Sequence, residues 1–224
     1  DNYNYHKGMN GIIQELTGLL KTKNIGTDSD RALLLDFQAT LETKPEKAIK
    51  LEKDALAQIE NITADNARLV SNLHANLGGL YRMNGHPDLA REHMEKSISL
   101  LDQFNLLHIN DSIPQIANYA MFLTEQQEPE RGISELQKLS GIIKEYHSDE
   151  CLDYAKVQET LATIYLMTAN LSHAKTHFKK AFKIYEKIWA DEPEMIEAKY
   201  QEIQELYPQI GFCIGKNLSG LLTK

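Results

Sequence analysis

Small and bulky apolar side chains recur along the chain at a fixed step of 42 residues. The pattern is clearest in residues 76–81, 118–123 and 160–165, where a small residue in third place is followed three positions later by Tyr or Leu. A second small residue stands twelve positions after each first one, at Ala90, Gly132 and Ala174, and Ala48 extends this series of equal steps backward. Self-similarity with a period of about 20–50 residues is typical of stacked repeat proteins. The pattern therefore predicts a repeat array rather than an ordinary helical bundle.

Each repeat is predicted to form two antiparallel helices. In the last clear copy, Leu161, Ile164 and Tyr165 lie on one helical face, and apolar residues then recur every three to four positions across 174–185. The polar break between them, 168–172, is short, so the two helices must run antiparallel. Three repeats also share a proline at one phase of the turn, where its missing N–H costs least: Pro45, Pro87 and Pro129.

The residues at these fixed positions resemble the tetratricopeptide repeat (TPR). The resemblance is carried by Leu77-Gly78, Tyr81, Gly85 and Ala90, and by Leu161-Ala162, Tyr165, Ala174, Phe178 and Ala181. The usual period is about 34 residues, and the longer period here is similar to that of kinesin light chain and of bacterial peptide-sensing regulators. Three positions depart from the pattern: Asp36 stands where a small residue is expected, and Ser97 and Leu139 stand where Ala is usual. HEAT and armadillo arrays have comparable periods, but they do not require the small-then-aromatic spacing.

The resemblance implies an all-α fold, a right-handed α-solenoid of helical hairpins with capping helices at its ends. We expect an array over 28–190, with a weak unit at 29–62 and clear units at 71–104, 113–146 and 155–188. An N-terminal helix over 1–27 is expected to cap the array or to form half a repeat, and a hairpin over 191–224 is expected to close it. The N-terminal helix has one apolar stripe: Ile12, Ile13, Leu16, Leu19 and Leu20. This stripe falls in the phase of a second helix, which suggests either a fragment of a longer protein or a natural capping helix.

Composition limits the kinds of partner. The chain has 224 residues and a net charge of −8. An acidic chain is a poor match for nucleic acid and for anionic membrane surfaces, both of which attract basic proteins. Cys151 and Cys213 lie in different units without a CxxC motif, so we expect reduced thiols and a cytoplasmic location. The sequence shows no signal-peptide pattern in its first 30 residues and no apolar run of transmembrane length.

The chain shows no pattern typical of an enzyme. Walker, GxGxxG and GxSxG motifs are absent from the sequence, and no nucleophile has an evident base beside it. His173 and His177 have the i, i+4 spacing of metal-binding helices, but Lys175 lies between them and further ligands are lacking. We interpret this pair as a solvated helix face, and we predict no metal, no cofactor and no catalysis.

Function is predicted to lie on the concave face, which the first helix of each hairpin lines in TPR proteins. The resemblance places ten residues there: Asn72, Asn76, Arg82, Met83, Asn118, Met121, Glu125, Lys156, Glu159 and Thr163. Asn76 and Asn118 share one phase, and an amide can donate to and accept from the backbone of an extended peptide. An ordinary bond to solvent or between helices explains them equally well. Methionine supplies an adaptable apolar lining, although Met at these positions also suits the core.

Two functions fit these features. The first is a protein–protein interaction scaffold that binds a partner segment in the groove. The alternative is a ligand- or peptide-sensing regulatory domain of a larger signalling or transcription-regulator chain. The sequence identifies neither the partner nor the oligomeric state.

Overall fold

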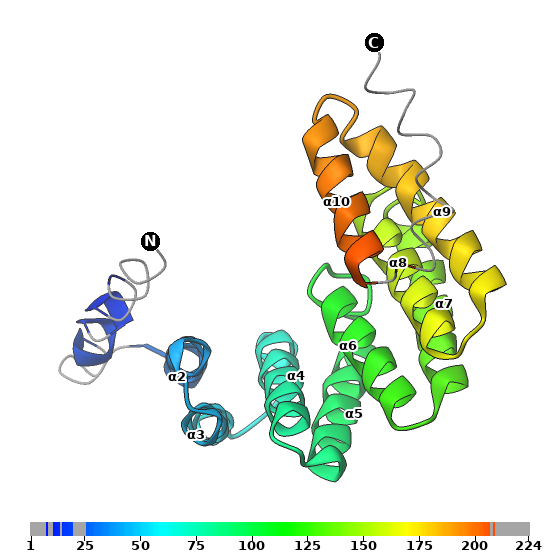
Figure 1. The fold of residues 1–224 in the computed structure, drawn as a ribbon. Helices are drawn as coiled ribbons and strands as arrows, with labels where there is room; N and C mark the ends of the chain where they lie inside the picture. Colours follow the sequence, from blue (N-terminus) through cyan, green and yellow to red (C-terminus); the bar gives the residue numbers. More distant parts are fainter. Residues whose placement is uncertain (1–7, 9–10, 14, 20–25, 207, 209–224) are drawn as a thin grey trace. The chain divides into compact units, whose positions relative to one another are not determined.

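The computed structural model describes residues 8, 11–13, 15–19, 26–206 and 208, and these ranges contain helices and no strand (Figure 1). The predicted all-α fold is therefore confirmed. None of the described helices has both the length and the apolar character that crossing a membrane requires. Leu20 of the predicted N-terminal stripe, Cys213, and residues 209–224 of the predicted closing hairpin lie outside the described residues.

Nine described helices have clear bounds. They are α2 Asp28–Leu41, α3 Pro45–Leu56, α4 Ala67–Met83, α5 Pro87–Gln103, α6 Ser112–Glu125, α7 Pro129–Tyr146, α8 Leu152–Met167, α9 Leu171–Ile188 and α10 Pro193–Leu206. The chain divides into two units, residues 1–107 and 108–224. In the first unit α2 pairs with α3 and α4 with α5; in the second, α6 pairs with α7, α8 pairs with α9, and α10 contacts α9. Each unit is thus a stack of helical hairpins.

The second helix of every hairpin begins at the same phase of the 42-residue repeat. Helices α3, α5 and α7 begin at the three prolines, and α9 begins at the equivalent Leu171. Proline fits the first helical position because its φ is already helical and the missing N–H would have no partner inside the helix. Two residues earlier the turn takes a positive φ, of 75° at Gly85, 65° at Gln127 and 58° at Ala169. The turn therefore requires a left-handed residue, a conformation that glycine adopts without strain.

The recurring small residues lie where the two helices of a hairpin approach each other closely. Three of them have exposed fractions of 2, 0 and 0 %: Ala48, Ala90 and Ala174. A Cβ atom added to Gly132 would lie 2.6 Å from the carbonyl oxygen of Ala120, and one added to Gly78 would lie 2.5 Å from Cγ of Met94. Both distances are far shorter than van der Waals contact, so larger side chains do not fit at these positions.

We predict that Ala174→Leu destabilises the protein by about 1–3 kcal/mol, because extra methylenes at a close approach force the neighbouring helix to shift. Urea unfolding followed by circular dichroism measures the effect. The matched control is Ala198→Leu at an exposed position of α10, which should change stability by less than about 0.5 kcal/mol. Equal stability of the two variants would show that Ala174 does not mark a helix–helix contact.

Candidate functional site

The first helices of the second unit line an open hollow of about 320 Å³. Met121 comes from α6 and Lys199 from α10, and α8 contributes four residues: Lys156, Glu159, Thr160 and Thr163. Four of the residues predicted from the sequence, Met121, Lys156, Glu159 and Thr163, therefore lie around one concavity.

Glu159 is the centre of a polar network at this hollow. One of its oxygens, Oε2, accepts a hydrogen bond of 2.6 Å from the Tyr185 hydroxyl, and the other lies 2.8 Å from Nζ of Lys199. The same ammonium lies 2.9 Å from Oε2 of Glu202. Burial alone lowers the pKa of Lys199, but the two carboxylates outweigh it and the pKa is raised overall. Burial and the nearby Glu159 both raise the pKa of Tyr185 above its ordinary value. The network joins α8, α9 and α10 at the edge of the hollow.

Lys156 is the most accessible charged group of the hollow, with 57 % of its side chain exposed. Its nearest carboxylate is Asp153 on the preceding turn, at 3.8 Å. The hydroxyls of Thr160 and Thr163 donate to backbone carbonyls of α8, at 3.0 and 3.1 Å, so both oxygens can still accept a hydrogen bond. Met121 is half-buried and adds an apolar surface.

Asn118 and Glu125 of α6 complete the predicted set in this unit. Both are exposed. Asn118 makes no hydrogen bond to the part of the chain that the structure describes, so its amide is open to a ligand, whereas Glu125 interacts with other groups of the protein.

The other four predicted residues lie on α4 in the first unit. Met83 is 82 % exposed, which suits a binding surface and excludes a core position. Asn72 and Arg82 are half-buried and interact with other groups of the protein. Asn76 is exposed, but Nδ2 of its amide donates to Oδ1 of Asp36 at 2.9 Å and to Oε1 of Glu52 at 3.2 Å. Asn76 and Asn118 are thus not equivalent, although they share a phase.

Asp36 of α2 and Glu52 of α3 form an acidic pair beneath Asn76. Glu52 is only 2 % exposed, and its Oε2 has no hydrogen-bond partner among the described residues. Burial and the neighbouring Asp36 carboxylate raise the pKa of Glu52 to about 8, and burial also raises the pKa of Asp36. Two adjacent buried carboxylates cannot both ionise at low cost, so the pair holds a proton at neutral pH.

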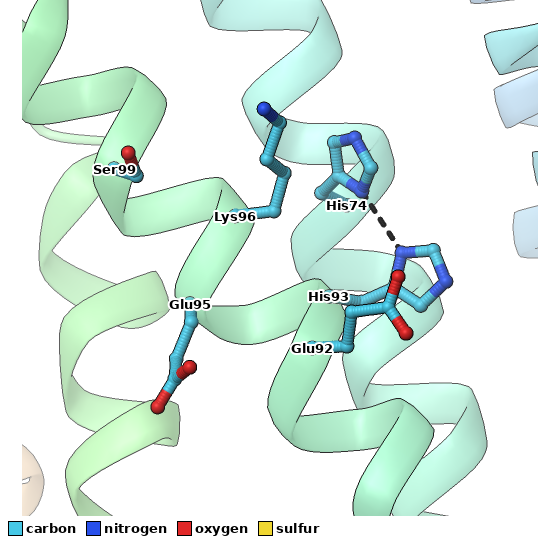
Figure 2. Close-up of a pocket in the computed structure, with 6 residues that line it drawn as sticks. All are labelled: His74, Glu92, His93, Glu95, Lys96 and Ser99. Atoms are coloured by element: carbon cyan, nitrogen blue, oxygen red, sulfur yellow. Dashed lines mark hydrogen bonds between the residues drawn. The ribbon is translucent and has the colours of Figure 1, made fainter.

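A histidine pair joins α4 to α5 beside a second hollow, of about 480 Å³ (Figure 2). The Nδ1 atoms of His74 and His93 are 2.9 Å apart, and the Tyr81 ring stacks on His93 at 5.4 Å. Burial, helped by His93 and Lys96, lowers the pKa of His74 to about 4, and burial also lowers the pKa of His93. Both rings are therefore neutral at pH 7, and one donates to the other.

The second unit repeats this arrangement 84 residues later. His177 Nδ1 bonds Gln158 Oε1 at 2.9 Å, and Tyr165 stacks on His177 at 5.3 Å and on His173 at 4.9 Å. The expectation that His173 and His177 form a solvated face is wrong for His177, which is half-buried against Tyr165. The sequence pattern did not reveal that this helix face meets the first helix of its own hairpin. Nowhere in the described residues do three or more His, Cys, Asp or Glu side chains gather as metal ligands would.

Comparison with known proteins identifies the repeat. Residues 112–187 match the tetratricopeptide repeat family model. In structure the chain is similar to BtubC (BKLC) from P. vanneervenii, with a TM-score of 0.68 and 18 % identity over 81 % of this chain and 72 % of that one. The family match covers α6 to α9, and the similar solved structure extends the shared fold to most of the chain.

Two further structures are similar. A putative kinesin light chain from Podosopora anserina with nearly identical TPR-like repeats has a TM-score of 0.62 and 16 % identity over 83 % of this chain and 92 % of that one. MamA has a TM-score of 0.55 and 15 % identity over 84 % and 94 %. Such low identities show a shared fold alone. No curated protein matches the sequence. TPR arrays generally serve as scaffolds for protein–protein interaction and are typically not enzymes.

Two features, the acidic pair of the first unit and Lys199 of the second, could not be anticipated from the repeat pattern. Glu52 was not singled out, although it stands 42 residues before Met94 and 84 before Leu136, in the register of a bulky apolar residue. Asp36 stood out only as a departure from the TPR pattern. Lys199 was missed because α10 lies in the segment expected to be a degenerate cap, where no repeat register predicts which side chain faces the hollow.

The acidic pair predicts how the free energy of unfolding depends on pH between 4.5 and about 8. The folded protein keeps a proton on Glu52 up to about pH 8, whereas a carboxyl of ordinary pKa 4.5 has lost it. The folded state therefore binds more protons between these values, and the free energy of unfolding falls as pH rises from 4.5 through 8. Glu52→Gln should make the free energy of unfolding less dependent on pH. Urea unfolding in buffers from pH 6 to 9 measures this. Glu46→Gln, an exposed change on the same helix, should leave the fall unchanged; equal slopes in both variants would contradict the assignment.

The histidines predict the opposite dependence in acid. The pKa of His74 is lowered from 6.5 to about 4, so the unfolded chain takes up a proton that the folded protein excludes, and stability is lost as pH falls through this range. His74→Gln copies the natural Gln158–His177 pair. We expect it to fold at pH 7 and to lose less stability than the parent between pH 7 and 4.5 in denaturant titrations. An acid loss as steep as in the parent would rule out His74 as a source.

Proposed function

We propose that this TPR protein is a non-enzymatic interaction module that binds an extended segment of a partner protein along its first helices. The observation that carries the proposal is the hollow of the second unit, where Met121, Lys156, Glu159 and Thr163 come together from two first helices. An apolar surface, an exposed cation and hydroxyl acceptors are the groups with which a peptide's side chains and N–H groups interact.

The paired groups around the hollow support binding rather than chemistry. The Glu159 carboxylate is held by Tyr185 and Lys199, so it is neither a free base nor an isolated charge. Lys156 and Asn118 remain accessible. The paired side chains of the hollow are therefore fixed before a partner arrives, which reduces the entropy lost on binding.

The sensor-domain alternative uses the same surface and differs only in the consequence of binding. The complete reading frame that encodes this chain would decide between them. An attached DNA-binding or enzymatic domain would favour the sensor, and its absence would favour the scaffold.

We predict that Lys156→Ala, Met121→Ala and Asn118→Ala each weaken binding of a partner peptide, with loss on the order of 0.5–1.5 kcal/mol per lost contact. The probe is a peptide selected from a random twelve-residue display library against the whole chain, and fluorescence polarisation measures its affinity. Lys179→Ala, an exposed lysine on α9, is the matched control. Full affinity in all three site variants, or equal loss in the control, would place binding elsewhere.

A further inference from the structure

The acidic pair of the first unit occupies positions that are apolar in every other repeat. Asp36 and Glu52 are 16 residues apart, and the residues at the same two phases in the later repeats are Gly78 and Met94, Ala120 and Leu136, and Ala162 and Phe178. All six of these are buried. In the α4–α5 hairpin the two positions lie in direct contact, because a Cβ on Gly78 would meet Cγ of Met94. Two carboxyl groups thus replace the central apolar contact of a hairpin.

This replacement has a structural cost that no counter-charge in the described part of the first unit offsets. Burying a carboxyl group without a counter-charge is unfavourable. No ion pair reaches Asp36 or Glu52 from the described residues, and Asn76 supplies two hydrogen bonds to the pair but no charge. The 2 % exposed Glu52 also keeps an oxygen without a partner among those residues. Residues that break the local rules of a fold are expected at functional sites.

We propose that the Asp36–Glu52 pair, with Asn76, is the seat of a basic side chain, arginine or lysine, of the partner segment. The pair opens to solvent through Asp36, which is half-buried, and Asn76, which is exposed. Asp36 belongs to α2 and Asn76 to α4, both first helices, and Glu52 meets them from α3, the second helix of the first hairpin. This inference rests on the proposed function and names the chemistry of its partner.

The donor set favours a basic side chain over a metal ion. Calcium takes about six to eight oxygen ligands, and zinc usually takes three or more protein ligands. The cluster offers two carboxyl groups, and the amide of Asn76 already donates to both. No third acidic or metal-binding side chain joins them in the described residues. A guanidinium group needs only acceptors, and its planar array of donors matches carboxylate geometry.

Binding of a cation changes the protonation of the pair in a way that can be measured. Glu52 holds its proton because burial and the neighbouring carboxylate disfavour a second negative charge. A guanidinium beside Asp36 offsets that charge, so the pair ionises fully and the proton passes to buffer. Calorimetry at pH 7 in buffers of different ionisation enthalpy should therefore show release of up to about one proton per bound peptide.

The test selects peptides from a random twelve-residue display library against the whole chain. We expect enrichment of peptides with an arginine or lysine whose affinity falls roughly tenfold or more in Asp36→Asn and in Glu52→Gln, the loss expected for a charge-assisted hydrogen bond. Asp54→Asn and Glu46→Gln, both exposed on α3, are the matched controls and should bind as the parent does. Proton release should disappear in Glu52→Gln.

A second variant separates binding from folding. The double change Asp36→Ala and Glu52→Leu reproduces the Ala120 and Leu136 pair of a later repeat. It should raise the thermal midpoint and abolish binding of the basic peptides, because it restores the apolar contact and removes the acids. Unchanged binding in this stabilised variant would overturn the proposal.

The other outcomes separate this inference from the proposed function. Enriched peptides that lack a basic residue, or that depend on Lys156 and Met121 but not on Asp36, would overturn the inference and leave the proposed function intact. Peptides that depend on Asp36 but not on Lys156 or Met121 would support the inference. They would also show that the hollow of the second unit is not the binding site. No enrichment at all would contradict both. A rise in thermal midpoint with Ca²⁺ or Zn²⁺ that is lost in Asp36→Asn would overturn the inference and assign the pair to a metal instead.

Discussion

Close approach of two helices at one small residue per hairpin is the contact on which the rest of this structure depends. Protein interiors are packed at crystal-like density, so a missing side chain on one helix must be filled by a bulky one from its neighbour. Gly78 against Met94 shows this pairing directly. The contact fixes how the two helices cross, and a 42-residue step repeats it. It uses one face of each first helix and leaves the remaining face available for other molecules.

The first hairpin keeps the positions of this contact and changes its chemistry. Asp36 and Glu52 are joined by the Asn76 amide and held together by a shared proton rather than by dispersion. The histidine pair of α4 and α5 is also a polar contact between the two helices of a hairpin, but it carries no charge. Ser71 with Ser97 and Gln158 with His177 form similar uncharged contacts. Uncharged polar contacts between helices therefore recur in this array. The acidic pair differs because Glu52 must hold a proton that a carboxyl group of ordinary pKa would have lost at neutral pH.

The sequence was sufficient to predict the fold because the small residues recur at equal steps, which no local fluctuation of composition imitates. The TPR resemblance also placed Lys156, Glu159, Thr163 and Met121 on one face of the first helices, because repeat register fixes which side of a first helix faces away from its partner. It could not predict that Lys199 and Tyr185 hold Glu159. The Lys199 contact depends on how α10 stacks on the α8–α9 hairpin, and the Tyr185 contact depends on how α8 and α9 cross. His177 was misread for a related reason: spacing along α9 gives its face, but only the crossing with α8 shows that Tyr165 covers it.

Two classes of charge line the hollow of the second unit, and they affect binding in different ways. The Glu159 and Lys199 side chains are 18 and 19 % exposed and lie 2.8 Å apart, so their desolvation has already occurred on folding and a partner gains little by approaching either. Lys156 is 57 % exposed, and its 3.8 Å contact with Asp153 is the kind of surface pair that contributes little stability. A partner can therefore bind Lys156 without a large loss elsewhere. The paired network fixes the shape of the hollow, and the affinity for a partner must come from Lys156, from the apolar surface of Met121 and from the open amide of Asn118.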